Sequence, residues 1–386
     1  MICSTGESAD HQELEDVFMG VTNVSWDVLG EFMTRVFEKE GLPEEDAKLC
    51  ADVLMESDRR GIESHGCNRF KPIYIDRIDK GILNPVTEIE ILKETPTTVV
   101  LDAHDGMGMV ASKKAMEICI EKAKTYGMAS AAIRNSSHYG IAGYWASMAV
   151  DAGMIGITGT NARPSIAPTF GVENMLGTNP LTIGLPTDEE FPFMIDCATS
   201  TIQNGRIEYY AKIGKDVPEG TVIGRDGKPI TDSKVALEYI RSKRAALSPL
   251  GGIGDKLAGY KGYGYATAIE ILCAALQNGI FLRDLEGKNE DGSIRPYHLG
   301  HFFIVIDPEA FLGLDNFRKT AGEICRELRA SEKAPGEERI YTAGEKEYLA
   351  WLQRKDVGAP VTDAVMKEFI GLRDRFGLTD IKFPGE

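Results

Sequence analysis

The residues best suited to chemistry lie within one stretch, Asp58–Tyr74. Ser64 and His65 are adjacent there, with a glycine close on each side, and Arg69 follows four residues after the histidine. An imidazole exchanges protons near neutral pH, and a guanidinium can hold a carboxylate through two parallel hydrogen bonds. This spacing suits chemistry on a small acid. The alternative is that His65 is an inert loop histidine, satisfied by a neighbour.

A serine hydrolase is a second chemistry that the same residues suggest. Gly61–Gly66 approaches the serine elbow of those enzymes, but Ile62 stands where that motif needs glycine. Adjacent side chains diverge on a regular helix or strand, so Ser64 would need another histidine, His138, as its base. A third possibility is a protein that binds an anion without catalysis.

Other polar or glycine-rich segments lie near predicted strands. Asn135–Gly140 follows a strand predicted over residues 128–134, and Thr160–Pro164 follows another predicted strand. Ligands of α/β proteins usually lie at such strand ends. Leu176–Leu181 is a tight glycine turn with hydroxyl and amide donors, and the glycines between positions 249 and 264 would let backbone approach a phosphate. Each segment could instead be a plain turn or a helix cap.

Several well-known motifs are missing from the sequence. Gly106–Ala111 lacks the third glycine of the dinucleotide fingerprint, and neither a phosphate-binding P-loop nor an HExxH zinc motif occurs. The seven cysteines are widely scattered and show no metal-ligand spacing, so no metal site is predicted. Cysteines that pack singly among apolar residues indicate a reducing compartment, and we expect a cytoplasmic protein.

Composition narrows the class of function. The chain has 386 residues, 43% hydrophobic and 26% charged, as in ordinary globular proteins of two or three domains. A net charge of −16 argues against nucleic acid or an anionic membrane as a partner. We expect neither a membrane span nor a secretion signal, because no apolar run has the length or flanks of either. Residues 1–20 are acidic and lack a helical or strand period, which predicts a loose leader.

The elements that must position these residues follow from the apolar periodicity. Strands and helices alternate between residues 97 and 307, and three helical segments follow residue 315. The polar stretch over residues 212–255 predicts long surface connections. The first eighty residues are expected to hold three helices, over residues 25–41, 43–60 and 70–81.

This alternation predicts an α/β protein with two parts. A central α/β domain is expected over residues 91–307. Helical segments 21–90 and 308–386, from the two ends of the chain, are expected to pack together as one domain.

Taken in order, the segments resemble the malate/L-lactate/ureidoglycolate dehydrogenase family. The resemblance implies hydride transfer between NAD(P) and C2 of a small 2-hydroxy or 2-oxo acid. It also implies a mixed-sheet α/β cofactor domain that is not a classical Rossmann fold, so the missing glycine fingerprint is expected. The matching motifs extend over roughly residues 25–377 and are Asp58–Gly66 with Arg69 and Tyr74, Ser137–Gly140, Asn161 with Pro164, Gly177–Leu181, Asp196–Ser200, Tyr260–Gly264, Gly300–Phe303 and Pro335–Glu337.

The resemblance implies roles for individual residues. His65 would be the acid/base, with Ser64 supporting it, and Arg69 would clamp the substrate carboxylate with Tyr74 nearby. His138 is a competing acid/base, so the histidine that carries the proton stays open at this point.

The remaining implied residues form the pocket wall and the cofactor site. Thr178 would line the substrate pocket. Cys197 stands where a methionine-like or small residue is expected, and residues 236–246 and 283–296 look longer than usual. The implied cofactor contacts are Ser137, His138, Tyr139, Gly140, Asn161, Asp196, Cys197, Ala198, Tyr260, Lys261, Pro335, Gly336 and Glu337.

The resemblance leaves the substrate open. Malate is favoured because Arg69 serves one carboxylate, while Arg163 or Lys261 would meet a second negative charge. L-lactate, sulfolactate, ureidoglycolate and cyclic imines are the alternatives on the same scaffold. NAD is the expected cofactor, with NADP as the alternative, and a homodimer is expected.

Overall fold

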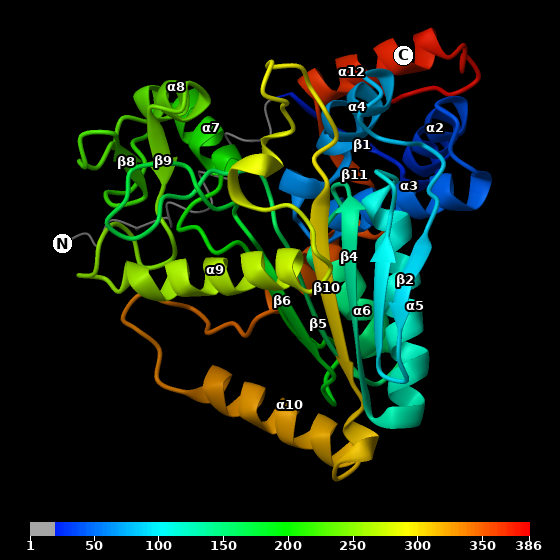
Figure 1. The fold of residues 1–386 in the computed structure, drawn as a ribbon, viewed down its shortest axis with the longest axis vertical. Coiled ribbons are helices and arrows are strands. Elements are labelled where there is room, and N and C mark those ends of the chain that lie inside the picture. The colour runs from blue at the N-terminus through cyan, green and yellow to red at the C-terminus, as the bar shows by residue number, and fades with distance from the viewer. Residues whose placement is uncertain (1–19) are drawn as a thin grey trace, which may run out of the picture. The chain divides into compact units, whose positions relative to one another are not determined.

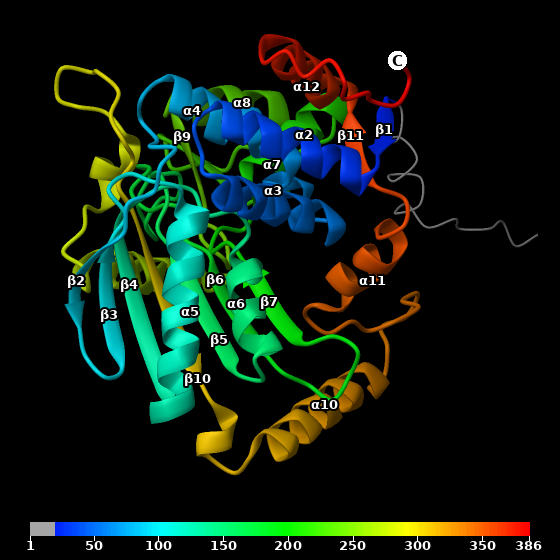
Figure 2. The same ribbon diagram turned by 90° about the vertical axis from the view of Figure 1, so that its right-hand side faces the viewer.

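The computed structural model describes residues 20–386 and divides into two compact units, shown from two directions in Figures 1 and 2. The first unit comprises the described residues up to Asp76 together with Glu347–Glu386, and the second comprises Arg77–Lys346. These bounds differ from the expected 21–90 with 308–386, because residues 77–90 and 308–346 belong to the second unit. The predicted leader lies outside the described residues, apart from Gly20.

The two ends of the chain meet in the first unit. Val21–Val24 (β1) pairs antiparallel with Ala359–Thr362 (β11), from Val21 opposite Thr362 to Val24 opposite Ala359. This pairing agrees with the expectation that the terminal segments pack together. The helices of the unit are α2 (Trp26–Lys39), α3 (Glu44–Arg59), α12 (Asp363–Arg375) and the C-terminal part of α11 (Glu345–Arg354).

An aromatic core holds the first unit together. On α2 the buried side chains recur at the spacing of one helix face, and they include Phe32 and Phe37. The Phe37 ring meets Phe70 edge-to-face, with ring centroids 4.8 Å apart, and the Phe32 ring lies 5.1 Å from Phe369. Each buried aromatic ring contributes a few kcal/mol through the apolar area that it removes from water, about 25 cal/mol per Å².

The chain that carries the predicted chemistry is irregular. After α3 come two short 3₁₀ turns, Glu63–His65 and Cys67–Arg69, and then a π-helix, Phe70–Ile75, which leads into α4 (Asp76–Asp79). The helix predicted over residues 70–81 is therefore present, but its first part has the wider π geometry. Such π segments are rare and occur frequently at functional sites.

The second unit is built on a seven-stranded mixed sheet, which confirms the predicted fold class. The strand order is β2-β3-β4-β10-β5-β6-β7, and only the β3–β4 pair is parallel. The strands are β2 (Glu90–Glu94), β3 (Thr98–Asp102), β4 (Met128–Ser136), β5 (Ile155–Thr160), β6 (Leu181–Leu185), β7 (Phe193–Cys197) and β10 (Leu299–Ile306).

Helices cover both faces of this sheet. Figure 2 shows α5 (Gly108–Tyr126) and α6 (Ala142–Asp151) over one face, and Figure 1 shows α9 (Gly259–Ala275) across the other. Gly108 lets α5 approach the end of β4, because a Cβ there would lie 2.2 Å from the carbonyl oxygen of Ser137. The central strands are thus covered on both faces, as in a layered α/β fold, whereas the edge strand β2 is exposed.

The stretch predicted as long surface connections is instead structured. Residues 204–247 form α7 (Asn204–Ile213), β8 (Val222–Gly224), α8 (Ser233–Arg241) and β9 (Ala245–Leu247). Strands β8 and β9 have only three residues each, which is too short to show an alternation of apolar and polar residues. They share a separate small core that includes Ile207, Val217, Val222, Ala236 and Leu247.

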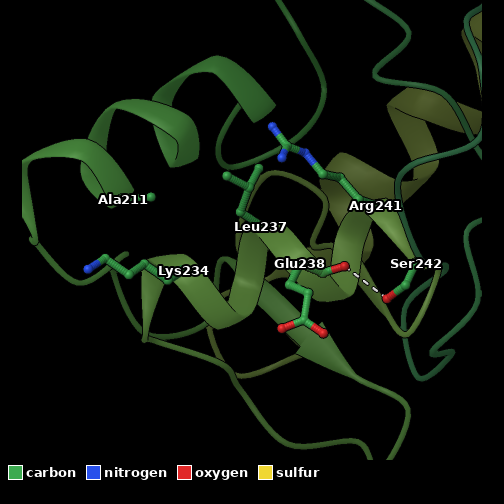
Figure 3. A pocket seen from close by; sticks show the side chains of 6 residues that line it. All are labelled: Ala211, Lys234, Leu237, Glu238, Arg241 and Ser242. Atoms are coloured by element: carbon green, nitrogen blue, oxygen red, sulfur yellow. Dashed lines mark hydrogen bonds between the residues drawn. The ribbon is translucent and has the colours of Figure 1, made fainter.

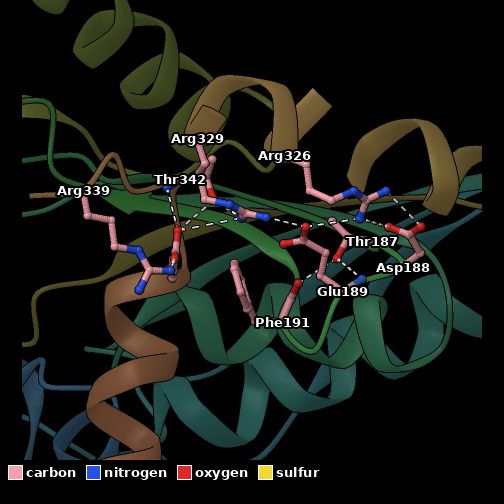
Figure 4. Close-up of polar contacts among 9 residues, drawn as sticks. Thr187, Asp188, Glu189, Phe191, Arg326, Arg329, Arg339 and Thr342 are labelled. Carbon is pink, nitrogen blue, oxygen red and sulfur yellow. Dashed lines mark hydrogen bonds and ion pairs between the residues drawn. The ribbon is translucent and has the colours of Figure 1, made fainter. Parts of the chain in front are cut away.

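Ion pairs explain why residues 308–346 belong to the second unit. After the 3₁₀ turns Leu282–Glu286 and Pro308–Ala310, α10 (Leu314–Ala330) carries arginines toward the loop between β6 and β7. Figure 4 shows Arg326 paired with Asp188 at 2.8 Å and Arg329 paired with Glu189. Further along, the Met194 amide donates to the carbonyl of Ala343 at 3.1 Å, so this segment is bonded to β7.

Candidate active site

Most of the predicted residues of the second unit gather at one edge of the sheet. Strands β4, β5 and β7 end at this edge, and their antiparallel neighbours β10 and β6 begin there. The segments brought to it are Ser137–Gly140 after β4, Asn161 after β5, Gly177–Thr178 before β6, and Asp196–Ala198 at the end of β7. These polar segments at strand ends therefore lie along one edge of the sheet.

His138 has a defined hydrogen-bonding state at this edge. Its side chain is half-buried, and its Nδ1 accepts a hydrogen bond from the backbone N–H of Gly140 at 3.2 Å. A ring nitrogen that accepts carries no proton, so the neutral imidazole of His138 carries its proton on Nε2. Neutral His138 therefore acts as a hydrogen-bond donor through Nε2.

Ser137 and Tyr139 serve the packing of this edge. The buried Ser137 hydroxyl donates to the carbonyl of Gly106 and accepts from the amide of Gly108, both at 2.9 Å. The Tyr139 ring is buried and stacked on His301 with centroids 4.5 Å apart. Because both side chains are enclosed, we assign them to holding the turn rather than to direct contact with a ligand.

Asn161 leaves one buried donor without a partner. Its side chain is fully buried, and its Oδ1 accepts from the amide of Gly300 at 2.8 Å. Its Nδ2 has no hydrogen-bond partner among the described residues. The Ser200 hydroxyl, in the segment after β7, is likewise buried without a partner. Unpaired buried polar groups are costly, so such groups at a strand-end edge fit a polar ligand that completes them.

Both carboxylate oxygens of Asp196 accept hydrogen bonds from other residues of the same unit. One carboxylate oxygen accepts from the amide of Gly143, in the first turn of α6, at 2.6 Å, and the other accepts from the hydroxyl of Thr182 at 2.9 Å. A carboxylate at a helix N-terminus is favoured by the helix dipole. Its neighbour Cys197 is half-buried, and burial followed by the charge of Asp196 raises the pKa of its thiol. Both residues therefore shape the edge, and neither offers a reactive group.

The glycine-rich segment over residues 249–264 packs closely around the start of α9. Tyr260 and Lys261 lie exposed in the first turn of this helix. A Cβ on Gly262 would lie 2.4 Å from backbone atoms of Leu250, so glycine is required for this contact. Lys261 supplies a positive charge beside closely packed backbone, as the sequence predicts for an anionic ligand.

The Pro335–Glu337 turn lies on the exposed segment between α10 and α11. The end of that segment is fixed by Glu345, which pairs with Arg339 and accepts from the backbone amide of Thr342 at 3.1 Å.

In the first unit, Ser64 and His65 are in direct contact. The Ser64 hydroxyl lies 3.0 Å from Nδ1 of His65. The expectation that these adjacent side chains diverge is wrong, because they stand on an irregular 3₁₀ turn rather than a regular element. The Nε of Arg69 donates to the carbonyl oxygen of Ser64 at 2.5 Å, so its guanidinium is directed back at this loop.

The protonation state of His65 follows from its surroundings. Burial, and then the positive charge of Arg69, lower the pKa of His65 to about 4. Both effects disfavour the charged imidazolium. The His65 ring is thus neutral at pH 7 and able to accept a proton.

Asp58 and Arg354 hold the loop that carries Ser64 and His65. A carboxylate oxygen of the buried Asp58 accepts from the amide of Cys67 at 2.8 Å, and a Cβ on Gly66 would lie 1.9 Å from the other. Burial raises the pKa of Asp58 to about 7. Arg354 donates to the Asp58 carbonyl at 2.6 Å and pairs with Glu63 at 2.5 Å. The loop is therefore fixed on both sides of the histidine.

Tyr74 and Thr178, the other two residues expected at the substrate pocket, differ in their exposure. The Tyr74 side chain is fully buried in the aromatic core, with its ring 6.1 Å from that of Phe37, so we assign it to packing. Thr178 is half-buried, and its carbonyl accepts from the Thr199 amide at 2.8 Å.

Several residues with a positioning role were missed by sequence reasoning. Besides Asp58 and Arg354, Asn179 bonds to Glu270 at 2.8 Å and to the Ala266 carbonyl at 3.0 Å, which ties the turn before β6 to α9. A signal was available, since Glu270 is an acidic residue within an otherwise apolar helix.

Other features of the described chain carry none of these residues. A surface groove of about 470 Å³ lies on α7 and α8 (Figure 3) and is lined by Ala211, Lys234, Leu237, Glu238, Arg241 and Ser242. Within residues 20–386, His, Cys, Asp and Glu form no group that could hold a metal ion. Over the same range, none of the helices combines the length and apolarity of a bilayer span.

Comparison with known proteins covers both units. A family model described as malate/L-lactate dehydrogenase matches residues 24–370. The chain is 41% identical over 352 residues to a malate dehydrogenase of Pyrococcus horikoshii, covering 91% of this chain and 95% of that protein. It is 41% identical over 324 residues to an L-sulfolactate dehydrogenase of Methanocaldococcus jannaschii, covering 83% and 88%. The crystal structure of malate dehydrogenase from Entamoeba histolytica matches with a TM-score of 0.89 and 44% identity, covering 92% and 98%.

Proposed function

Because the chain belongs to the malate/L-lactate dehydrogenase family, we propose that it transfers hydride between NAD and C2 of malate and oxaloacetate. The observation that carries this proposal is the contact of Ser64 with His65, with Arg69 bonded to the same serine. A proton-moving group and a carboxylate-binding group are thereby held within six residues. When bound, the nicotinamide supplies the hydride chemistry, and the chain supplies orientation and proton transfer.

We assign the proton to His65. Oxidation of a secondary alcohol requires a base that takes the hydroxyl proton, and His65 is neutral at pH 7 because its pKa is lowered to about 4. We propose that Nδ1 of His65 donates to the Ser64 hydroxyl, so that Nε2 carries no proton and is the nitrogen that accepts one from the substrate. Neutral His138 already carries its proton on Nε2, since its Nδ1 accepts from Gly140. His138 is therefore proposed as a hydrogen-bond donor rather than the base.

Arg69 is proposed to bind the substrate carboxylate and to tune His65 at the same time. A bound carboxylate offsets the positive charge that lowers the pKa of His65. The pKa of His65 then rises toward the working pH, where general acid–base catalysis is most effective. Substrate binding and base strength are thus coupled through one guanidinium.

The residues of the sheet edge are proposed to hold the cofactor. Asn161 offers a buried amide donor, and Lys261 offers a positive charge at the start of α9. Tyr260 and the Pro335–Glu337 turn remain proposed contacts on exposed segments. Ser137, Tyr139 and Asp196 are proposed to act through the shape of the edge.

A second negative charge on the substrate favours malate over lactate. Arg163, two residues after Asn161, is exposed, and its guanidinium lies 5.6 Å from the centroid of the Tyr297 ring. Arg77 lies 4.4 Å from the same ring centroid, so two cations flank one tyrosine. This concentration of positive charge in an acidic protein supports recognition of a dicarboxylate.

The serine hydrolase alternative is not proposed. It rested on His138 as the base for Ser64, whereas the contact of Ser64 is with His65. In addition, Ile62 stands where the serine elbow of those enzymes needs glycine.

A homodimer in the cytoplasm is proposed from the surface and the cysteines. Helix α9 exposes the apolar side chains of Tyr265 and Ile271, and α10 exposes Ile324 and Leu328. Apolar helix faces of this kind are usually covered by a partner. All cysteines in the described range are free, as expected in a reducing compartment. Sedimentation should give twice the chain mass, and an active monomer would contradict the dimer.

The test of the proposed function is a cofactor titration followed by turnover. NADH and NADPH are titrated separately, and the absorbance of the reduced cofactor is then followed with oxaloacetate, pyruvate, sulfopyruvate and a cyclic imine. We expect binding of NADH and the fastest loss of absorbance with oxaloacetate. If neither cofactor binds and no 2-oxo acid is reduced, the proposal is wrong.

A further inference from the structure

A buried histidine lies at the centre of the sheet edge. His301 belongs to β10, which runs between β4 and β5, and its side chain is fully buried. Its Nε2 lies 2.9 Å from the hydroxyl of Ser136, at the end of β4, and its Nδ1 lies 2.8 Å from the hydroxyl of Thr160, at the end of β5. One ring therefore joins the ends of two strands on either side of its own.

The direction of each hydrogen bond can be deduced. The single hydroxyl proton of Thr160 is used toward backbone carbonyls, at 2.9 Å to Asn161 and 3.2 Å to Gly300. Since a carbonyl can only accept, the Thr160 oxygen must accept from Nδ1 of His301. Burial lowers the pKa of His301 to about 3, so the ring is neutral and has one proton. Nε2 therefore accepts from the Ser136 hydroxyl.

The hydrogen bonds that link Ser136, His301 and Thr160 end beside two segments that are proposed to hold the cofactor. These are the Ser137–Gly140 turn and the turn that begins at Asn161. Ser136 directly precedes the Ser137–Gly140 turn, and the His301 ring is stacked on Tyr139 of that turn with an interplanar angle of 11°. At the other end, Thr160 directly precedes Asn161, whose side-chain oxygen accepts from the amide next to His301 at 2.8 Å. Movement of the ring would displace His138 and Asn161 together.

We propose that His301 is a positioning residue that sets the spacing between the His138 and Asn161 turns for the nicotinamide cofactor. The side chain is enclosed, so it acts through Ser136 and Thr160 and not by touching the ligand. The inference rests on the proposed function, because it assumes that this edge receives the cofactor. It adds His301 to the residues proposed for cofactor binding. The role of His301 is to hold Ser136 and Thr160 in place by accepting a hydrogen bond from the first and donating one to the second.

The test uses substitutions that remove one hydroxyl at nearly constant volume. Thr160→Val and Ser136→Ala each break one link, and Thr160→Ser restores the hydroxyl. Ser130→Ala is the matched control, since Ser130 also lies on β4 and donates to a β10 carbonyl, that of Phe303, at 2.9 Å, away from the edge. The readouts are the Kd for NADH by fluorescence, the thermal midpoint, and the nitrogen NMR signals of labelled histidine.

We expect Thr160→Val and Ser136→Ala to raise the Kd for NADH about tenfold, with Thr160→Ser and Ser130→Ala within about twofold of the parent. The NMR spectrum of the parent at pH 7 should show His301 protonated on Nδ1. Parent-like NADH binding in both broken-link variants, or protonation on Nε2, overturns the inference. A parent that binds neither NADH nor NADPH overturns the proposed function instead, so the two failures are distinguishable.

Discussion

The Nε of Arg69 donates to the carbonyl oxygen of Ser64 at 2.5 Å, so the residue proposed to hold the substrate also fixes the backbone beside His65. A single side chain thus fixes the backbone beside the histidine that is proposed to move the proton and, through its charge, adds to the effect of burial that lowers the pKa of that histidine. This link makes several outcomes predictable.

Removal of the Arg69 guanidinium should weaken catalysis on oxaloacetate and raise the pKa of His65. In Arg69→Gln we expect kcat/KM for oxaloacetate to fall, because an ionic clamp is lost. The fall should correspond to an increase of about 2–5 kcal/mol in the activation free energy. The pKa of His65 should rise, since the nearby positive charge is gone, and histidine NMR measures this. Arg60→Gln, in the same stretch, is the control and should leave kcat/KM within about threefold. An unchanged KM and kcat in Arg69→Gln would remove Arg69 from the site.

The two candidate histidines should respond differently. His65→Ala is expected to lower kcat for malate oxidation about a hundredfold or more, because the base is lost. His138→Ala should lose only about tenfold, because it removes a hydrogen-bond donor. The measurement is steady-state kcat in both directions, with NADH affinity determined for each variant. A larger loss in His138→Ala would reverse the assignment.

The stability of the loop that carries Ser64 and His65 should depend on a hydrogen-bond acceptor at position 58. Asp58→Ala leaves the Cys67 amide unpaired and should cost about 1–3 kcal/mol of unfolding free energy, whereas Asp58→Asn keeps an acceptor and should cost less. The folded-state pKa of Asp58 is raised from 3.8 to about 7, so the folded state retains a proton that the unfolded state releases. The unfolding free energy of the parent should therefore receive a contribution that falls as pH rises from about 4 to 7, absent in Asp58→Asn. Urea unfolding across this range measures the difference, and parallel pH curves for the two proteins would contradict it.

His301 should make the opposite contribution to pH dependence. Its pKa is lowered from 6.5 to about 3 on folding, so between these values the unfolded state binds a proton and the folded state does not. Stability should fall as pH drops through this window, by about 2 kcal/mol between pH 7 and pH 5. His301→Asn should lack that fall, as urea unfolding at the two pH values can determine. His65 titrates in the same direction in both proteins and cancels from the comparison.

Arg163 should matter only for substrates with a second acid group. In Arg163→Met we expect kcat/KM for oxaloacetate to fall about tenfold or more, with pyruvate reduction nearly unchanged, because only oxaloacetate has a second carboxylate. Lys261→Met tests the alternative cation. Equal losses on both substrates would show that Arg163 acts on folding or cofactor binding and not on specificity.

Most of the fold could be predicted because the apolar patterns of its major elements are long. Helix α2 and strand β5 lie where their periodicity places them. Strands β8 and β9 could not be predicted, because strands of three residues show no period.

The site was less predictable, because its supports come from distant segments. The bond from His301 to Ser136 spans 165 positions, and that from Arg354 to Asp58 spans 296. Sequence spacing shows which residues are neighbours along an element but not which strands are neighbours in a sheet. The contact between Ser64 and His65 was missed for a local reason, since a regular element was assumed where two 3₁₀ turns are found.

The pairing of β1 with β11 has a consequence for the order of folding during synthesis. The second unit can assemble once the ribosome has released residue 346, since its sheet and helices come from consecutive chain. The first unit must wait for residues 359–362, because its N-terminal strand pairs with no other strand. The segment around His65 is therefore expected to reach its final structure last. A chain cut short before residue 359 would then contain the folded edge that is proposed to hold the cofactor, but not yet the ordered segment that is proposed to supply the base.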